Sequence, residues 1–503
     1  MNSARSVLWG IVSALAIFLS LGAWSLASPV GSSPDDNFHL ASIWCGQGER
    51  EGLCEKGDKE PWRLVPHELS IGLCYVAQPR TTGKCTEEHL VVTDDMVPTK
   101  NVNSKGLYPP GYYWIYSFFV TPNVAVTTLA IRLTNAALFA ILMVATWFAL
   151  PRRLRPVLGW SSAVTVVPLG MFLIASINPS SWAITSLAVL FPSVLGFLHT
   201  TGKRRIVLGA MSAVAALMAF SSRGDAATYA AVSVLAALVL SFRPERSFLT
   251  RAILPAVIVI AAGVATVSAG QVGSALGGLS TTEPVGSLSM LVVQNLLNLP
   301  SLIAGAFGQT WGLGWLETMM PPVVWAFVIF VTAGTVFAAL RWQGWRKALA
   351  LAGVGATLIV VPMYILVSSG VLVGSQVQPR YLLPLLTVFV AVALAPSQDL
   401  APSARVGQRL SAMQTIVGGV LLVTANAVAL LFTMRRYVAP DYLYLDSHID
   451  WWWAAGPSPM TTLVIGALSF CAALAVLVSS CIRISARMQE DDDQSRYAAS
   501  ASV

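Results

Sequence analysis

Charge is scarce in this sequence. Of its 503 residues only 11% are Asp, Glu, Lys or Arg, whereas 55% are hydrophobic, and the mean hydropathy is +0.68. Soluble globular proteins carry about 25% charged residues, so the composition excludes a chain whose whole surface faces water. The net charge of +7 does not indicate nucleic-acid binding, because the basic residues stand in short clusters between apolar runs.

Several common catalytic signatures are also missing. The sequence has no G-x-x-x-x-G-K-[ST] phosphate loop, no H-E-x-x-H metal motif and no G-x-S-x-G nucleophile elbow. Its five histidines do not cluster at the spacing of metal ligands. These absences argue against P-loop nucleotide hydrolases, zinc proteases of that motif and serine hydrolases of the α/β type.

Long hydrophobic runs dominate what is present. Runs of about 18 or more apolar residues predict membrane-spanning helices, and we expect an all-α polytopic membrane protein with about 12 of them. The predicted spans begin near Val7, Val124, Val157, Ser181, Ile206, Ala226, Ala252, Val323, Ala348, Tyr381, Ala412 and Thr461.

Basic clusters follow every second run, at 152–155, 203–205, 243–251, 341–347, 405–409 and 483–487. By the positive-inside rule these loops and both termini are cytoplasmic, and we expect the protein in the bacterial plasma membrane. The first run, Val7 to Leu26, also resembles a secretory signal. We favour a retained helix because the run is longer than a usual signal core.

This topology divides the chain into four parts. Residues 1–28 form the first transmembrane helix, and 29–121 form a large extracytoplasmic loop. Residues 122–485 form the bundle, with outer loops near 269–321 and 435–459, and 486–503 form a disordered cytoplasmic tail. The stretch SMLVVQNLLNLPSLIAGAF is apolar but contains two Asn and a Pro, and predicts a helix lying at the membrane interface.

Cysteine is rare, yet four of the six cysteines lie in the first large loop, namely Cys45, Cys54, Cys74 and Cys85. An even number in an oxidising compartment predicts two disulfides, with three possible connectivities. Zinc binding is the alternative, which the lack of a C-x-x-C pair disfavours.

Polar residues at the outer boundary are the candidates for chemistry. The string SPDDNFH puts Asp35, Asp36 and His39 where the first helix emerges, and adjacent carboxylates there suit a general base or a cation site. A solvated turn is the alternative. The string YPPGYYWIY contains Tyr108 and Tyr112, which either anchor the chain at the interface or stack on a sugar ring.

Other outer-turn residues are weaker candidates for substrate binding: Asn178 in INPSSWAI, and Trp315 and Glu317 in GWLETMMPP. Three isolated arginines, Arg132, Arg223 and Arg380, lie in or beside spans, where a charge needs a partner. A lipid phosphate would suit them; salt bridges to Asp225, Glu317 or Asp36 are the alternative.

The ordered set PDDNFH, YPPGYY, INPSS, GWLETMMP and QPRYLLPL resembles the bacterial membrane family known as domain of unknown function 2142. That family is similar to GT-C glycosyltransferases, such as the protein mannosyltransferases and the lipid A aminoarabinose transferases. The resemblance covers residues from about Pro34 to Leu386.

The resemblance implies a GT-C-like fold and a membrane glycosyltransferase with a polyprenyl-phosphate sugar donor. A cell-envelope glycan or lipid would be the acceptor. It implies Asp35 or Asp36 as catalytic base and Arg380, with Arg132 or Arg223, at the donor phosphate. Some GT-C enzymes need a divalent metal and others do not. A transporter of lipid-linked saccharide and a non-catalytic envelope-assembly protein are the competing hypotheses.

Overall fold

The computed structural model describes residues 3–70, 74–270, 287–375, 377–396, 410–442, 445 and 449–500. Within these residues, eleven helices are long and apolar enough to cross a membrane. They are α1 (Ser3–Leu26), α5 (Val124–Ala149), α8 (Ser180–His199), α9 (Gly202–Ser222), α10 (Gly224–Ser241), α11 (Arg246–Ser268), α13 (Leu288–Gly305), α14 (Pro322–Ala339), α15 (Trp345–Ser368), α17 (Ala412–Val438) and α18 (Pro459–Ser500). The predicted all-α polytopic fold is confirmed.

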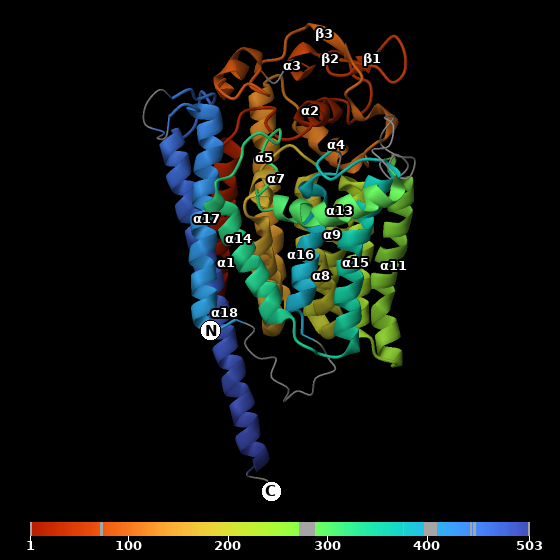
Figure 1. The fold of residues 1–503 in the computed structure, drawn as a ribbon, viewed down its shortest axis with the longest axis vertical. Coiled ribbons are helices and arrows are strands. Elements are labelled where there is room, and N and C mark those ends of the chain that lie inside the picture. The colour runs from red at the N-terminus through yellow and green to blue at the C-terminus, as the bar shows by residue number, and fades with distance from the viewer. Residues whose placement is uncertain are drawn as a thin grey trace.

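The long helices stand side by side, and the segment 29–121 covers one end of the bundle (Figure 1), which we call the loop end. The start of α1 and the end of α18 lie toward the opposite end. The predicted basic loop at 405–409 lies outside the described residues. Which end faces the cytoplasm stays a prediction from the charge pattern.

Two helices form the centre of the bundle. Every residue of α8 from Ser180 to Leu198 is buried, and α16 (Pro379–Leu394), which packs against α8, is buried along nearly its whole length. Apart from Arg380, their buried residues are apolar or are small Ser and Thr residues, which is the pattern of a helix enclosed by others. With 16 residues, α16 is about 24 Å long, shorter than the other spans.

The span expected from Val157 is interrupted. The chain forms α6 (Arg155–Val166) and then the short α7 (Leu169–Ile174). Pro168 stands between them, and proline lacks the N–H that would continue the helix. The pattern of apolar residues therefore identified the segment but not its break.

Helix α13 is the segment predicted to lie at the interface. It is long enough to span, yet Figure 1 shows it running across the long helices at the loop end. Asn295, at its middle, donates to the carbonyl of Val371 and accepts from the N–H of Val373, at 2.9 and 2.8 Å. Its last residue, Gly305, lies against Pro379. The first contact is with the connection between α15 and α16 and the second is with the first residue of α16, so α13 packs against the loop end of the bundle.

The first loop is a small folded layer. A three-stranded antiparallel sheet, β1 (Glu55–Lys56), β2 (Arg63–Pro66) and β3 (Met96–Thr99), has the order β1-β2-β3. Around it lie α2 (Asp36–Trp44), α3 (His67–Ser70), α4 (Gly111–Tyr116) and the 3₁₀ turns Gly83–His89, Asn103–Lys105 and Ser117–Phe119. A fourth 3₁₀ turn, Arg152–Leu154, precedes α6.

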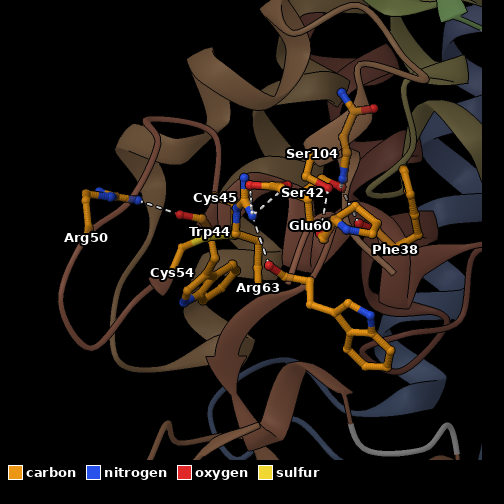
Figure 2. Close-up of a disulfide and its surroundings, with 12 residues drawn as sticks. Phe38, Ser42, Trp44, Cys45, Arg50, Cys54, Glu60, Arg63 and Ser104 are labelled. Atoms are coloured by element: carbon orange, nitrogen blue, oxygen red, sulfur yellow. Dashed lines mark hydrogen bonds and ion pairs between the residues drawn. A yellow bond between two sulfur atoms is a disulfide. The ribbon is translucent and has the colours of Figure 1, made fainter. Parts of the chain in front are cut away.

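Two disulfides hold this layer, as the sequence predicts. Of the three possible connectivities, the structure has Cys45–Cys54 and Cys74–Cys85. The first lies at the end of α2, where Arg50 also donates to the carbonyl of Trp44 at 2.8 Å (Figure 2). Both links therefore close short loops over the bundle.

The C-terminal tail differs from its prediction. Helix α18 continues to Ser500 and projects beyond the bundle (Figure 1), where the sequence predicts disorder from residue 486. The segment Arg487–Glu490 contains Met, Gln and Glu, which are strong helix formers, and the preceding span supplies the helix that they extend. Residues 501–503 lie outside the described part.

Candidate functional site

Four helices begin close together at the loop end. Their first residues are Asp36 of α2, Ser180 of α8, Gly224 of α10 and Pro379 of α16. The amide of Asn178 donates to the carbonyl of Pro34 at 3.0 Å, and Arg380 donates to the same oxygen at 3.3 Å. Helix N-termini carry partial positive charge, so this meeting point favours negatively charged groups.

Asp35 sits in the turn before α2. Its φ of 61° is left-handed, a conformation that Asp and Asn tolerate better than most residues. Its carboxylate accepts from Arg380 at 2.5 Å. The side chain of Asp35 is 46% exposed while that of Arg380 is 3% exposed. The structure thus holds an accessible carboxylate against a buried guanidinium.

Tyr381 lies between two arginines. Its hydroxyl accepts from Arg380 at 3.1 Å, and the centre of the Arg223 guanidinium lies 4.4 Å from its ring centroid. Arg223 is also held by both carboxylate oxygens of Asp225, at 2.8 and 2.9 Å. Arg223 and Arg380 are therefore brought to one place, each already paired with a carboxylate.

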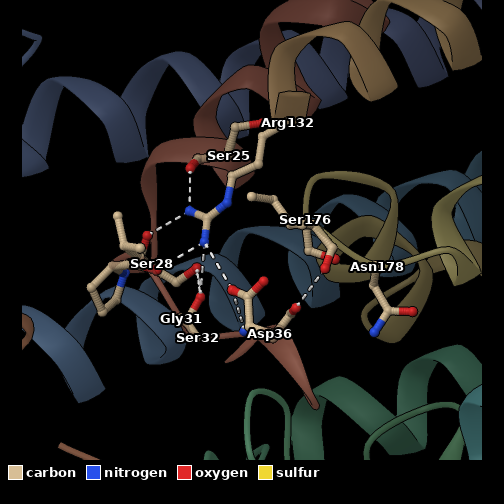
Figure 3. A network of polar contacts seen from close by, with 12 residues as sticks. Ser25, Ser28, Gly31, Ser32, Asp36, Arg132, Ser176 and Asn178 are labelled. Carbon is tan, nitrogen blue, oxygen red and sulfur yellow. Dashed lines mark hydrogen bonds and ion pairs between the residues drawn. The ribbon is translucent and has the colours of Figure 1, made fainter. Parts of the chain in front are cut away.

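Asp36 points into a different network, inside the bundle. It is fully buried and faces Arg132 at 3.9 Å (Figure 3). Arg132 donates to the carbonyls of Ser25, Ser28 and Pro29 at 2.8–2.9 Å. The sequence groups Arg132 with phosphate ligands, but a fully buried guanidinium with these partners is not open to a lipid phosphate in this structure.

The two carboxyl groups differ in acidity. Burial by itself raises the pKa of Asp35, but the charge and hydrogen bond of Arg380 outweigh it and hold that pKa below its usual value. Burial raises the pKa of Asp36 to about 6, against the opposing charge of Arg132. Asp35 is therefore the more acidic and the more accessible member of the pair.

The aromatic residues of the loop form one cluster beside this pair. His39 Nδ1 lies 2.9 Å from the hydroxyl of Tyr113, and the His39 and Tyr108 ring centroids are 5.3 Å apart. Burial lowers the pKa of His39 to about 3, so the imidazole is neutral at physiological pH. Tyr112 is buried against Trp182, at 5.3 Å between centroids, and supports the cluster from inside.

Three predicted substrate-binding residues have structural partners. Asn178 holds the turn before Asp35, as described above. Trp315 donates to the carbonyl of Gly31 at 2.9 Å. Glu317 accepts from Arg436 at 2.9 Å and from the N–H of Ala77 at 3.0 Å. Trp315 and Glu317 therefore fasten the first loop to the bundle.

Comparison with known proteins adds the family. The model of the family described as a predicted membrane protein, domain of unknown function 2142, matches residues 18–389. The chain belongs to this family. No curated protein matches it.

One solved structure is similar to this member of the family. It is the crystal structure of ArnT from Cupriavidus metallidurans bound to undecaprenyl phosphate. The identity is 12%, the TM-score is 0.41, and the match covers 95% of this chain and 78% of that one.

The sequence did not single out three residues beside the acid pair. Tyr381 and Gln378 flank the Pro379–Arg380 pair in the string QPRYLLPL, and this string was their available signal. Gln378 and Trp311 line a recess next to Arg380. Trp311 lies outside the strings that carry the resemblance, and only the fold brings it beside Gln378.

Among the residues that the structure describes, no group of three or more His, Cys, Asp or Glu side chains is arranged to hold a metal ion. Asp35 and Asp36 do not converge on one point, since each pairs with a different arginine. The charge available for an anionic ligand comes from Arg380 and Arg223.

Proposed function

We propose that the protein is a glycosyltransferase of the cytoplasmic membrane that takes a sugar from a polyprenyl-phosphate donor. The acceptor is a hydroxyl group of an envelope glycan or lipid on the extracytoplasmic side. The observation that carries the proposal is the pairing of the accessible Asp35 carboxylate with the buried Arg380 guanidinium.

This pair offers the two functions that glycosyl transfer needs. A phosphate binds a guanidinium through charge-assisted hydrogen bonds, so donor binding at Arg380 competes with Asp35 for the same nitrogen. Once the phosphate takes that place, the carboxylate loses its strongest stabilising partner. The pKa of Asp35 then rises and the carboxylate becomes a better proton acceptor.

The transfer step follows from this arrangement. The acceptor oxygen attacks the anomeric carbon, and the bond between that carbon and the phosphate oxygen breaks. Asp35 takes the proton from the acceptor hydroxyl, and the bond electrons leave with the phosphate. Arg380, with Arg223 nearby, stabilises the charge that develops on the leaving group. Attack opposite the phosphate inverts the anomeric centre.

Asp36 has a positioning role in this proposal. It is fully buried and faces Arg132, whereas the acceptor needs a carboxylate that it can reach. The carbonyl of Pro34, held by Asn178, fixes the turn that presents Asp35. A base at Asp35 therefore fits the geometry better than a base at Asp36.

The test uses the full-length protein in bilayer nanodiscs with radiolabelled polyprenyl-phosphate sugars and envelope acceptors. We expect Asp35→Asn to lower transfer by about 10²–10⁴-fold and to stay folded, because Asn also tolerates the left-handed turn. Asp58→Asn changes an exposed carboxylate of the same loop and should leave transfer unchanged. Arg380→Lys should raise the donor KM, with the exposed Arg80→Lys as its control.

The outcomes separate the hypotheses. Full transfer by Asp35→Asn would reject Asp35 as the base. A folded Asp36→Asn variant that loses transfer while Asp35→Asn keeps it would reverse the two roles. No transfer from any donor, together with movement of labelled donor across a liposome bilayer, would reject the enzyme in favour of a transporter.

A further inference from the structure

Basic residues gather at the end of the bundle opposite the loop end (Figure 1). Helices α5, α8 and α10 end there, and α9 and α11 begin there. The segments 152–155, 199–206 and 242–251 contain nine Lys and Arg residues and one acid, Glu245. We call these nine the basic cluster: Arg152, Arg153, Arg155, Lys203, Arg204, Arg205, Arg243, Arg246 and Arg251. A charge pattern that only sets topology requires no contact between loops, so the packing of the three segments decides what else they can do.

The helix ends that carry these segments are packed closely together. A Cβ atom at Gly196 of α8 would lie 2.7 Å from Leu150, which follows α5, and 3.0 Å from Leu208 of α9. The Nε2 atom of His199, the last residue of α8, lies 3.0 Å from the hydroxyl oxygen of Ser241, the last residue of α10. The three segments therefore meet around the last turn of α8.

Two arginines fasten these helix ends to one another. Arg251 of α11 donates to the carbonyl of Leu198 at 3.3 Å. Arg155 donates to the carbonyls of Leu150 and Phe148 at 3.2 and 3.3 Å. The last carbonyls of a helix have no helical partner, so both arginines act as caps. The charge that an external ligand meets comes from the other members of the cluster.

Charges from different segments lie within reach of one another. Arg155, which follows α5, is repelled by Arg204 at the start of α9. His199 is repelled by Arg153, which also follows α5, and by Arg243, which follows α10. Like charges brought together destabilise a fold unless counter-charge is supplied. An anion bound at this place would offset the repulsion.

Three members of the cluster are exposed on this surface. They are Arg152, Arg153 and Arg204. Within the described ranges, none of the three forms an ion pair with a carboxylate. Guanidinium groups bind phosphate oxygens through charge-assisted hydrogen bonds, so the cluster favours a phosphate.

The surface next to the cluster is apolar. Ile206 of α9 follows Arg205 directly, and Leu249 and Ile253 of α11 stand on either side of Arg251 in the sequence. All three apolar side chains are more than 60% exposed, and α9 and α11 pack against each other. A lipid has its phosphate at the membrane surface and its acyl chains along such helices, whereas a soluble phosphate needs the cations alone.

We propose that the basic cluster binds the phosphate headgroup of an anionic phospholipid, with Arg153 and Arg204 at the phosphate and the acyl chains along α9 and α11. Basic pockets between helix ends on the cytoplasmic side of membrane proteins bind such headgroups. The predicted topology places this lipid in the cytoplasmic leaflet. The site lies at the other end of the bundle from Asp35, so it does not depend on the proposed transfer reaction.

The experiment measures lipid binding by native mass spectrometry of the full-length protein in nonionic detergent. The protein is titrated with phosphatidylglycerol, cardiolipin and phosphatidylcholine, and with glycerol 3-phosphate as a soluble phosphate. The test variant is the double substitution Arg153→Gln, Arg204→Gln. The matched control is Arg341→Gln, Arg483→Gln, which removes two exposed basic residues outside the cluster. The melting temperature of each variant shows that it is folded.

We expect wild type and the control to bind phosphatidylglycerol at least about tenfold more tightly than phosphatidylcholine. The test variant should bind phosphatidylglycerol about tenfold to thirtyfold more weakly, because two of the charges that attract the headgroup are lost. Its affinity for phosphatidylcholine should be unchanged. The double variant Arg153→Lys, Arg204→Lys keeps both charges and should retain most of the preference.

Three outcomes would overturn the lipid site. Equal affinity of wild type for phosphatidylglycerol and phosphatidylcholine would leave the cluster with a role in topology alone. An unchanged preference in the folded Arg153→Gln, Arg204→Gln variant would separate lipid binding from the cluster. Glycerol 3-phosphate that binds as tightly as phosphatidylglycerol would assign the cluster to a soluble phosphate. None of these measurements needs sugar transfer, so failure of the proposed function would not affect them.

Discussion

Asp35 and Asp36 are neighbours in sequence but have different surroundings. The left-handed turn at Asp35 sends its carboxylate toward Arg380, while Asp36 starts α2 and faces Arg132. The side chain of Asp35 is almost half exposed, whereas that of Asp36 is fully buried. The sequence could show that two acids stand at the boundary, but only the backbone conformation decides which one a substrate reaches.

The buried carboxyl group should make stability depend on pH. The pKa of Asp36 is about 6 in the folded protein and 3.8 in its ordinary state, so the folded state holds the proton more tightly. The contribution of this group is full below pH 3.8 and is lost as the pH rises through about 6. This shift of about two pKa units corresponds to about 3 kcal/mol of folding free energy.

We therefore expect wild type to lose stability relative to Asp36→Asn between pH 4 and 7. Thermal unfolding in detergent, followed by tryptophan fluorescence, measures the difference at each pH. The exposed Asp58→Asn variant corrects for the titration of all other groups. A difference between wild type and Asp36→Asn that is constant with pH would contradict the assignment.

At the scale of elements, Arg132 of α5 caps the end of α1. Its guanidinium donates hydrogen bonds to the carbonyls of Ser25, Ser28 and Pro29. These carbonyls have no helical N–H partner because α1 ends there. Arg132→Met should lower stability by about 3–5 kcal/mol, because it also leaves Asp36 as an unpaired buried acid. The melting temperature measures this loss, with the exposed Arg80→Met as control. A raised donor KM in a variant of unchanged stability would instead support the phosphate role that the sequence indicates.

The loop closed by Cys74–Cys85 holds a second junction between layers. Arg436 of α17 donates hydrogen bonds to the carbonyls of Tyr75, Gln78 and Thr81 at 2.7–3.2 Å. It also forms an ion pair with Glu317. We expect the double variant Cys74→Ser, Cys85→Ser to lose about 2–4 kcal/mol of stability. In wild type, alkylation without reductant should label none of the four loop cysteines, as mass spectrometry would show. Labelling of all four without reductant would exclude both disulfides.

For the whole molecule, the orientation in the membrane is open to a direct test. Lys105 is exposed in the first loop, and Arg204 is exposed at the start of α9, on the side of the predicted cytoplasmic loops. A membrane-impermeant maleimide added to intact cells should label Lys105→Cys and not Arg204→Cys. Permeabilised cells should show both. Labelling of Arg204→Cys alone in intact cells would invert the predicted topology.

The parts of this architecture that the sequence predicts are those set by long apolar runs and by charge. The spans, the folded first loop and the crosswise α13 follow from hydropathy and from the polar interruptions at Asn295, Asn298 and Pro300. The break at Pro168 was missed because the apolar run continues through it. Arg132 and Arg380 look alike in the sequence, since each is a single arginine at a span. They differ because one meets the end of α1 and the other meets a turn open to solvent.

The opposite directions of the two acids have a consequence for the history of the family. If Asp35 serves Arg380 and Asp36 serves Arg132, the two positions are under separate selection despite their adjacency. Substitutions at 36 should then be correlated with those at 132, and substitutions at 35 with those at 380. A one-residue insertion or deletion between the first helix and α2 would exchange the positions of the buried Asp36 and the exposed Asp35. The length of that turn should therefore vary less among family members than its composition.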